Sequence, residues 1–292
     1  MSSAAGIQVG QATIRYRFRT ALPGALAVTV LLLGAIGMVL PFLWMFATSM
    51  QSATTAYDLP PNWLPLPLST TNYEAAVTGP VPLLQTMLNS FIVAFVVAIV
   101  NVITAPMAGF AFAKLRFPFK TPLLLLLLAS LMVPIQVTII PLFVLLRNLG
   151  LIDTLVSLIL PVMTGAFGVF MMRQFFLALP DEILEAARID GAGVWTTYRT
   201  IAMPLAKAAI AALGVIMFLL SWNAYFMPLI FISSLERTTM PLALVLMLGP
   251  YGSGNVAMIM AATTIAIVPA LIVFLVAQRW IVESLTRTGV KG

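Results

Sequence analysis

The sequence predicts an all-α, polytopic membrane protein with six transmembrane helices. Of its 292 residues, 61% are hydrophobic and 8% are charged, whereas a soluble domain carries about 25% charged residues. Six stretches lack Lys, Arg, Asp and Glu, and they approach or exceed the roughly 20 apolar residues that cross a membrane. The chain contains no Cys and no His, which excludes disulfides and any metal or catalytic site built on thiolate or imidazole.

The first predicted span follows three arginines, as the core of a signal peptide would. Its apolar run is longer than the roughly 7 to 15 residues of such a core, and no cleavage pattern closes it, so a membrane helix is expected. Every span contains proline, which frees a helical carbonyl and kinks the axis. In order, the spans are 24–48, 89–112, 122–145, 155–172, 208–231 and 256–278.

The cations orient these spans. All but two of the 15 Lys and Arg residues, Arg147 and Arg237, fall on one side of the predicted topology. Because cations in short loops stay on the cytoplasmic side, both termini are expected in the cytoplasm. The chain then divides into an N-terminal segment at 1–23, a membrane domain at 24–278 with a cytoplasmic hairpin at 180–207, and a tail at 279–292. The basic pI of about 10.0 matches anionic lipid headgroups and indicates no nucleic-acid partner.

Two loops on the outer side carry their own predictions. The Pro-rich centre at 59–69 cannot be helical throughout and is expected to form an ordered cap or a short extended segment. The segment 239–254 is apolar but too short and too broken by Gly and Pro to cross a membrane. We expect it on the surface or as a re-entrant piece shielded by protein.

The spans contain no Lys, Arg, Asp or Glu, which limits how transport is powered. Proton relays and voltage sensors need ionisable groups inside the membrane, so a proton-driven transporter is not favoured. Sodium sites built from carbonyls and hydroxyls remain open. The sequence therefore indicates that energy enters from a partner.

The polar hairpin is the strongest local signal. Leu179-Pro180-Asp181-Glu182 is typical of a helix start, and Gly191 is placed to end that helix in a left-handed conformation. An apolar side is expected from Leu184, Ala187 and Ile189. A second short helix is predicted over 194–201, ending before Met203-Pro204. On pattern alone, an ordinary amphipathic helix lying in the headgroup layer through Trp195, Tyr198 and Ile201 fits equally well.

The hairpin resembles the EAA signature of bacterial ABC importer permeases. It matches in residue type, in spacing and in its place before the penultimate span, with Met203 where the family often has Leu. The matching residues are Glu185, Ala186, Ala187, Asp190, Gly191, Ala192, Ile201 and Pro204. Further residues resemble those of carbohydrate-import permeases, namely Pro61, Trp63, Pro65, Asn72, Tyr73, Asn89 and Ser90. The tail from Gln278 is similar to that of the maltose-permease G-type subunit.

This resemblance implies a type I ABC importer permease fold in a bacterial inner membrane. It implies that the hairpin docks in a cytoplasmic ATPase dimer, whose closure on ATP rotates the spans. It also implies a second, F-type permease subunit, an extracytoplasmic binding protein that delivers sugar, and a tail contact with the ATPase through Gly289, Lys291 and Gly292. The tail cations are equally explained as topology-setting charges. The chain has no phosphate loop, so it is not expected to be an enzyme, and ATP and Mg would be bound by the partner.

A sugar path requires hydrogen-bonding groups and aromatic faces, and the fifth span offers both in Ser221, Trp222, Asn223 and Tyr225. Buried amides and hydroxyls also hold membrane helices together, and packing against the second permease is the favoured interpretation of these residues. Asn101, Gln136 and Thr138 are weaker candidates. Two alternatives stay open: an ABC permease for another solute, such as a polyol or a glycerol phosphoester, and an ion-coupled or facilitative carrier acting alone. A lone carrier would be expected to show internal repeats, and none is visible.

Overall fold

The computed structural model describes residues 8–52, 55–56, 63, 68–249 and 254–289, with side chains from 26 to 278. Helices make up the regular structure of these residues, which include no β-strand. The chain is an all-α polytopic membrane protein, as predicted. Among the described residues, four helices are long and apolar enough to cross a membrane, and a bent pair of helices makes a fifth if the pair is counted as one span. One further apolar helix, at 166–177, is shorter.

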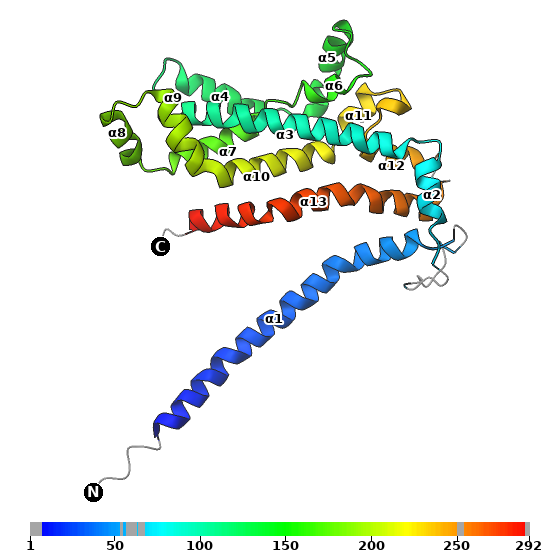
Figure 1. The fold of residues 1–292 in the computed structure, drawn as a ribbon, viewed down its shortest axis with the longest axis horizontal. Coiled ribbons are helices and arrows are strands. Elements are labelled where there is room, and N and C mark those ends of the chain that lie inside the picture. Colours follow the sequence, from blue (N-terminus) through cyan, green and yellow to red (C-terminus); the bar gives the residue numbers. More distant parts are fainter. Residues whose placement is uncertain (1–7, 53–54, 57–62, 64–67, 250–253, 290–292) are drawn as a thin grey trace.

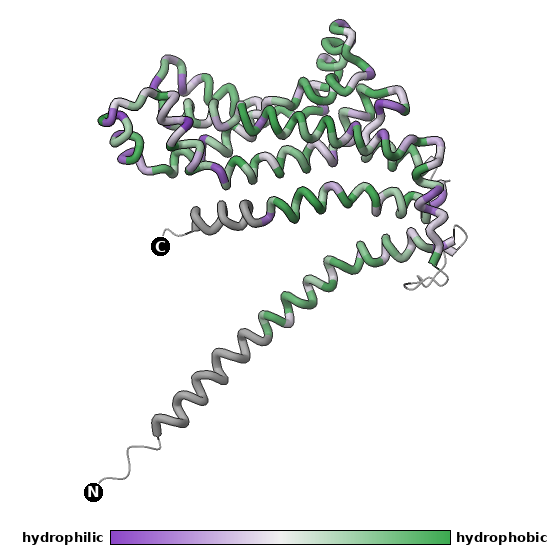
Figure 2. Tube along the Cα trace, viewed as in Figure 1, coloured by the Kyte–Doolittle hydropathy of each residue, from purple (hydrophilic) through white to green (hydrophobic). Residues whose placement is uncertain are grey.

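Three predicted spans form long helices. The first lies in α1 (Gln8–Ser49), the second in α3 (Leu83–Lys114) and the sixth in α13 (Val256–Gly289). Figure 1 shows α3 and α13 running beside α10 (Met203–Trp222), while α1 leads away from them. Figure 2 shows hydrophilic residues concentrated around α8 (Asp181–Ile189) and around α2 (Thr71–Thr78), at opposite ends of α3.

The other three predicted spans are not single straight helices. Span 122–145 is divided into α4 (Lys120–Leu131) and α5 (Ile135–Asn148), which meet at 99°. Pro134 lies at this break, where it lacks an N–H and restricts the residue before it. Span 208–231 is interrupted after α10, and α11 (Phe226–Phe231) follows.

Span 155–172 is the clearest error. It contains only α6 (Leu155–Ile159) and the first half of α7 (Ala166–Leu177), with a non-helical turn between them. The buried side chain of Asn101 holds this turn. Its amide donates to the carbonyls of Val162 and Met163 at 3.2 and 3.1 Å, and its carbonyl accepts from the N–H of Gly165 at 3.3 Å. A side chain on α3 therefore provides hydrogen bonds for backbone groups that, in a continuous helix, would bond to one another.

The core lies where α3 packs against α7 and α10. Small residues allow the close approach, as is usual between membrane helices. A Cβ added to Gly109 would lie 2.7 Å from the Cβ of Met172 and 2.8 Å from the backbone N of Arg173. Phe110 meets Phe176 edge-on, with ring centroids 5.5 Å apart.

The two outer loops differ in how far they can be described. Most of 59–69 lies outside the described residues, and after it α2 forms a helix that was not predicted. Segment 239–254 contains α12 (Met240–Met247), which packs against α3 and α13. Met240, Leu242, Ala243 and Met247 are buried. The described part of this segment is a short apolar helix with one buried face, which agrees with either a surface or a re-entrant piece.

Candidate functional site

The first helix of the hairpin has the predicted ends. Pro180 is its N-cap and α8 starts at Asp181. Gly191 has φ +78°. The N–H of Gly191 donates to the carbonyl of Arg188 at 3.0 Å, and the N–H of Ala192 donates to the carbonyl of Ala187 at 2.9 Å. These two bonds form a Schellman motif, which satisfies carbonyls left free at the end of a helix.

The second half of the hairpin departs from the prediction. Instead of ending before Met203-Pro204, α9 (Val194–Thr197) continues through a π-helical turn, η1 (Tyr198–Ala202), into α10. A proline inside a helix clashes with the carbonyl four residues earlier, here that of Thr200. That carbonyl lies within the wider π turn, which accommodates Pro204 without ending the helix. The hairpin is therefore continuous with a membrane span.

Burial separates the hairpin residues into two groups. Ala187 is buried with Leu184, and Tyr198 packs on Phe110 with ring centroids 5.3 Å apart. Glu185, Ala186, Asp190 and Gly191 are exposed, and Ala192 and Ile201 are half-buried. Pro204 is also exposed.

The predicted apolar side of the hairpin is wrong at Ile189. Ile189 is 86% exposed, because positions five and two residues after Leu184 and Ala187 lie on a different face of the helix. Trp195 and Val194 are 60% and 55% exposed on the next helix. The hairpin thus presents large apolar side chains together with exposed polar groups, a composition typical of a protein contact surface.

An ion pair that sequence reasoning missed anchors the hairpin. The ammonium of Lys114, at the end of α3, lies 2.6 Å from Oδ1 of Asp181 and donates to the carbonyl of Leu179 at 2.8 Å. Its side chain is only 7% exposed. The hydrogen bond from Lys114 holds the pKa of Asp181 below its usual value. The two residues are 67 positions apart, so no local pattern could have paired them.

The polar residues of the fifth span lie where α10 ends. Trp222 is 3% exposed and stacks on Phe218, so it belongs to the core. Asn223 is exposed, and its amide donates to the carbonyl of Leu219 at 2.8 Å. Ser221 is half-buried and Tyr225 is 36% exposed. Neither of their hydroxyls hydrogen-bonds to a described residue, so both are available to a ligand.

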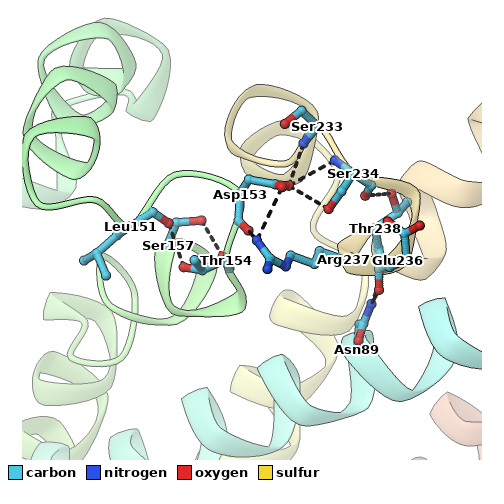
Figure 3. Close-up of polar contacts among 10 residues, drawn as sticks. All are labelled: Asn89, Leu151, Asp153, Thr154, Ser157, Ser233, Ser234, Glu236, Arg237 and Thr238. Atoms are coloured by element: carbon cyan, nitrogen blue, oxygen red, sulfur yellow. Dashed lines mark hydrogen bonds and ion pairs between the residues drawn. The ribbon is translucent and has the colours of Figure 1, made fainter.

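A third polar cluster lies at the opposite end of α3 from α8. Figure 3 shows Asp153 between two loops, with Oδ1 accepting from the N–H groups of Ser233 and Ser234 at 3.0 Å each and from the Ser234 hydroxyl at 2.9 Å. Arg237 contacts the same residue through its guanidinium. These bonds, led by that from the Ser234 N–H, hold the pKa of Asp153 below its usual value.

Three residues singled out by the resemblance form hydrogen bonds at this same end of the molecule. The amide of Asn89 donates to the carbonyls of Glu236 and Thr238 at 2.8 and 2.9 Å, and the Ser90 hydroxyl accepts from the N–H of Met240 at 2.7 Å. Asn72 donates to the carbonyls of Ser49 and Gln51 at 2.9 and 2.7 Å. These side chains join segments distant in sequence.

Several predicted site residues have no such description. Gly289 is the last residue of α13, and Lys291 and Gly292 lie outside the described residues. Pro61 and Pro65 also lie outside them, whereas Trp63 is half-exposed. Among the described side chains, Gln136 is exposed and Thr138 donates to the carbonyl of its own helix at Ile135. The described residues hold no group of three Asp or Glu that could bind a metal ion.

Long apolar spans and a polar hairpin continuous with one of them define an all-α polytopic membrane protein. The chain belongs to the family of binding-protein-dependent transport system inner membrane components, whose model matches residues 105–287. It is therefore an ABC importer permease subunit.

Similar proteins cover most of the chain. The sn-glycerol-3-phosphate transport system permease protein UgpE of Brucella abortus (strain 2308) is 35% identical over 266 residues, which are 89% of this chain and 94% of the relative. UgpE of Yersinia pestis (bv. Antiqua, strain Antiqua) is 32% identical over 262 residues, 88% and 93% of the two chains. A chain of a bacterial ABC transporter involved in the import of the acidic polysaccharide alginate has the same fold, with a TM-score of 0.77 at 20% identity, over 89% and 97% of the chains.

Proposed function

We propose that this chain is one of two permease subunits of an ATP-driven sugar importer and that its hairpin couples the pore to a cytoplasmic ATPase dimer. The single observation that carries the coupling role is the continuity of the hairpin with α10 through η1. Because α9, η1 and α10 form one helical rod, a push on the hairpin moves a membrane span directly. The contact residues are the exposed Glu185, Ala186, Asp190 and Gly191, with Ala187 and Ala192 supporting them. Ile201 and Pro204 lie in the rod, and both termini are cytoplasmic.

The partner permease is supported by α1. From Leu26 to Phe42 its described side chains are exposed, and it packs on α13 only toward its C-terminal end. A helix that leaves its own bundle gains packing from a second subunit. The second subunit, the ATPase and the extracytoplasmic binding protein complete the importer. ATP and Mg belong to the ATPase, and the tail residues Gly289, Lys291 and Gly292 form a second ATPase contact.

The substrate class rests on the end of α10. Ser221, Asn223 and Tyr225 offer uncharged hydrogen-bonding groups and an aromatic face at a helix break, as a polyhydroxylated solute requires. The buried Trp222 supports this site from behind through its stack on Phe218. A glycerol phosphoester is the second candidate, favoured by the UgpE relatives. A phosphoester would need a cation at the site, and these side chains supply none.

The test is purification with an N-terminal tag from the native host in mild detergent, followed by mass spectrometry and transport assays in liposomes. We expect an ATPase, a second permease and a binding protein to co-purify, and uptake to require ATP. The solute retained by the binding protein then separates a sugar from a glycerol phosphoester. Recovery of the chain alone, active in liposomes without ATP, would refute the importer and support a carrier.

A further inference from the structure

A cleft beside the start of α8 is lined by more cationic side chains than the ion pair that anchors the hairpin requires. It has a volume of about 760 Å³ and lies between the end of α3, the start of α4 and α8. Four cationic side chains and two carboxylates line it. They are Lys114, Arg116, Lys120, Arg188, Asp181 and Glu185.

The two lysines already have structural partners. Lys114 pairs with Asp181, and Lys120 donates to the carbonyls of Leu115 and Ala113 at 2.8 and 3.4 Å, at the end of α3. Arg116 and Arg188 are exposed, and neither side chain makes a hydrogen bond or ion pair with a described residue. Arg116 belongs to the turn after α3 and Arg188 to α8, so two guanidinium groups without a hydrogen-bond partner among the described residues line the cleft from different walls. Two such groups favour a bound anion.

The helix that starts at this cleft is available to lipid. None of the residues of α4 is buried, and Leu123, Leu125 and Leu126 are 46%, 60% and 69% exposed. Phe119, immediately before the helix, is 76% exposed. Aromatic residues and cations next to an apolar helix are typical of the headgroup layer of a membrane. The cleft reaches α4 at Lys120, the first residue of that helix.

We propose that this cleft binds the phosphate of an anionic phospholipid, held by Arg116 and Arg188, with the acyl chains along α4. The planar guanidinium forms paired hydrogen bonds with phosphate oxygens, which suits it to this task. The exposed leucines of α4 select a lipid over a soluble phosphate, because only a lipid gains from covering them. The site does not depend on what the importer carries.

The test measures lipid binding to the full chain in detergent by native mass spectrometry, with phosphatidylglycerol and phosphatidylcholine as probes. We expect wild-type chain to prefer phosphatidylglycerol, and Arg116→Gln/Arg188→Gln to bind it roughly thirtyfold more weakly, since a basic residue near an anionic surface contributes about a factor of five. Arg147→Gln/Arg199→Gln removes the same charge from two exposed positions outside the cleft, and it should bind like wild type.

Three results would overturn the lipid site. Equal affinity of the cleft variant and the wild type would remove these arginines from lipid binding. Displacement of the lipid by millimolar inorganic phosphate would make the ligand a soluble anion. Loss of ATPase co-purification with unchanged lipid binding would make the cleft a protein contact. Thermal melting reports folding, and the single variant Arg116→Gln, in an exposed turn, replaces the double variant if that does not fold.

Discussion

At the scale of single residues, Gly191 combines a structural requirement with the proposed coupling role. Its φ of +78° is in the left-handed region, where a side chain costs roughly 1–2 kcal/mol. A Cβ there would meet no atom within 4 Å, so a larger residue has room in the isolated chain. Any severe effect of a bulky residue must therefore come mainly from a partner.

We predict that Gly191→Trp abolishes ATP-dependent uptake while the chain still inserts into the membrane. The matched control is Gly150→Trp, because Gly150 also has positive φ (+69°) and open space but lies after α5, away from the hairpin. Uptake and membrane content are measured together. Normal uptake by Gly191→Trp, or equal loss in both variants, would contradict the proposed docking at the hairpin.

Asp153 leads to a pH prediction. Its pKa is lowered mainly by the hydrogen bond from the Ser234 N–H. The charged carboxylate is therefore more favourable in the folded than in the unfolded chain, and it stabilises the folded state. This stabilisation is present above the pKa of an unfolded Asp, about 4, and is lost as the pH falls through the lower folded value. Asp153 also has φ +59°, which Asn tolerates well. Asp153→Asn should therefore fold but lose the part of the acid-induced decrease in melting temperature that this carboxylate causes.

That measurement is a thermal melt of the detergent-purified chain as a function of pH. Asp181→Asn is the comparison, since Asp181 is exposed and its lowered pKa comes from Lys114 instead. Wild type and Asp153→Asn with identical pH profiles would show that the carboxylate does not act as the structure implies.

Asn101 and Asn223 are both asparagines within predicted spans, yet we predict different effects when each is replaced by alanine. Asn101 is fully buried and holds the turn before α7, so Asn101→Ala should lower folding yield by leaving buried backbone groups unpaired, at roughly 1–3 kcal/mol. Asn223 is exposed, and among the described residues its side chain hydrogen-bonds only to the carbonyl of Leu219. Asn223→Ala should change uptake kinetics at unchanged melting temperature and ATPase co-purification. Unchanged kinetics would return Asn223 to a helix-capping role.

At the scale of elements, hydropathy locates apolar stretches but does not say where a helix breaks. It placed α1, α3 and α13 well because each stretch is long and is continued by good helix formers. It failed at α4 and α5, because Pro134 interrupts the helix between them. It also failed at α6 and α7, because hydrogen bonds from Asn101 stabilise a non-helical turn between them. The hairpin start and the Gly191 end were predictable because caps are local signals.

The packing of α3 on α7 gives a stability prediction. Gly109→Val should lower stability by roughly 1–3 kcal/mol, because its Cβ would overlap Met172 and the backbone of Arg173. Gly34→Val on α1 is the control, since a Cβ there meets nothing within 4 Å. Melting temperatures of the isolated chain in detergent decide the outcome. Equal melting of the two variants would mean that the two helices do not approach as closely as described.

At the scale of the whole molecule, α1 is the part that the chain alone does not explain. Its exposed face and its departure from the bundle support a second subunit. The absence of cysteine from the sequence makes this testable without background. We predict that Leu33→Cys cross-links to single cysteines in the second permease, and that Leu126→Cys on the exposed α4 does not. Cross-links from α4 alone would place the partner elsewhere.

The sequence by itself determined the membrane class, the three long spans, the ends of α8 and the family, because these depend on composition, on local capping and on a motif of fixed spacing. Only the tertiary structure decided which helices break, how η1 joins the hairpin to α10, and which polar residues are partners. Asp181 with Lys114, Asn89 with Thr238 and Asp153 with Ser234 are each more than 60 residues apart. Such pairs form only once packing brings distant segments together, so no local pattern contains them.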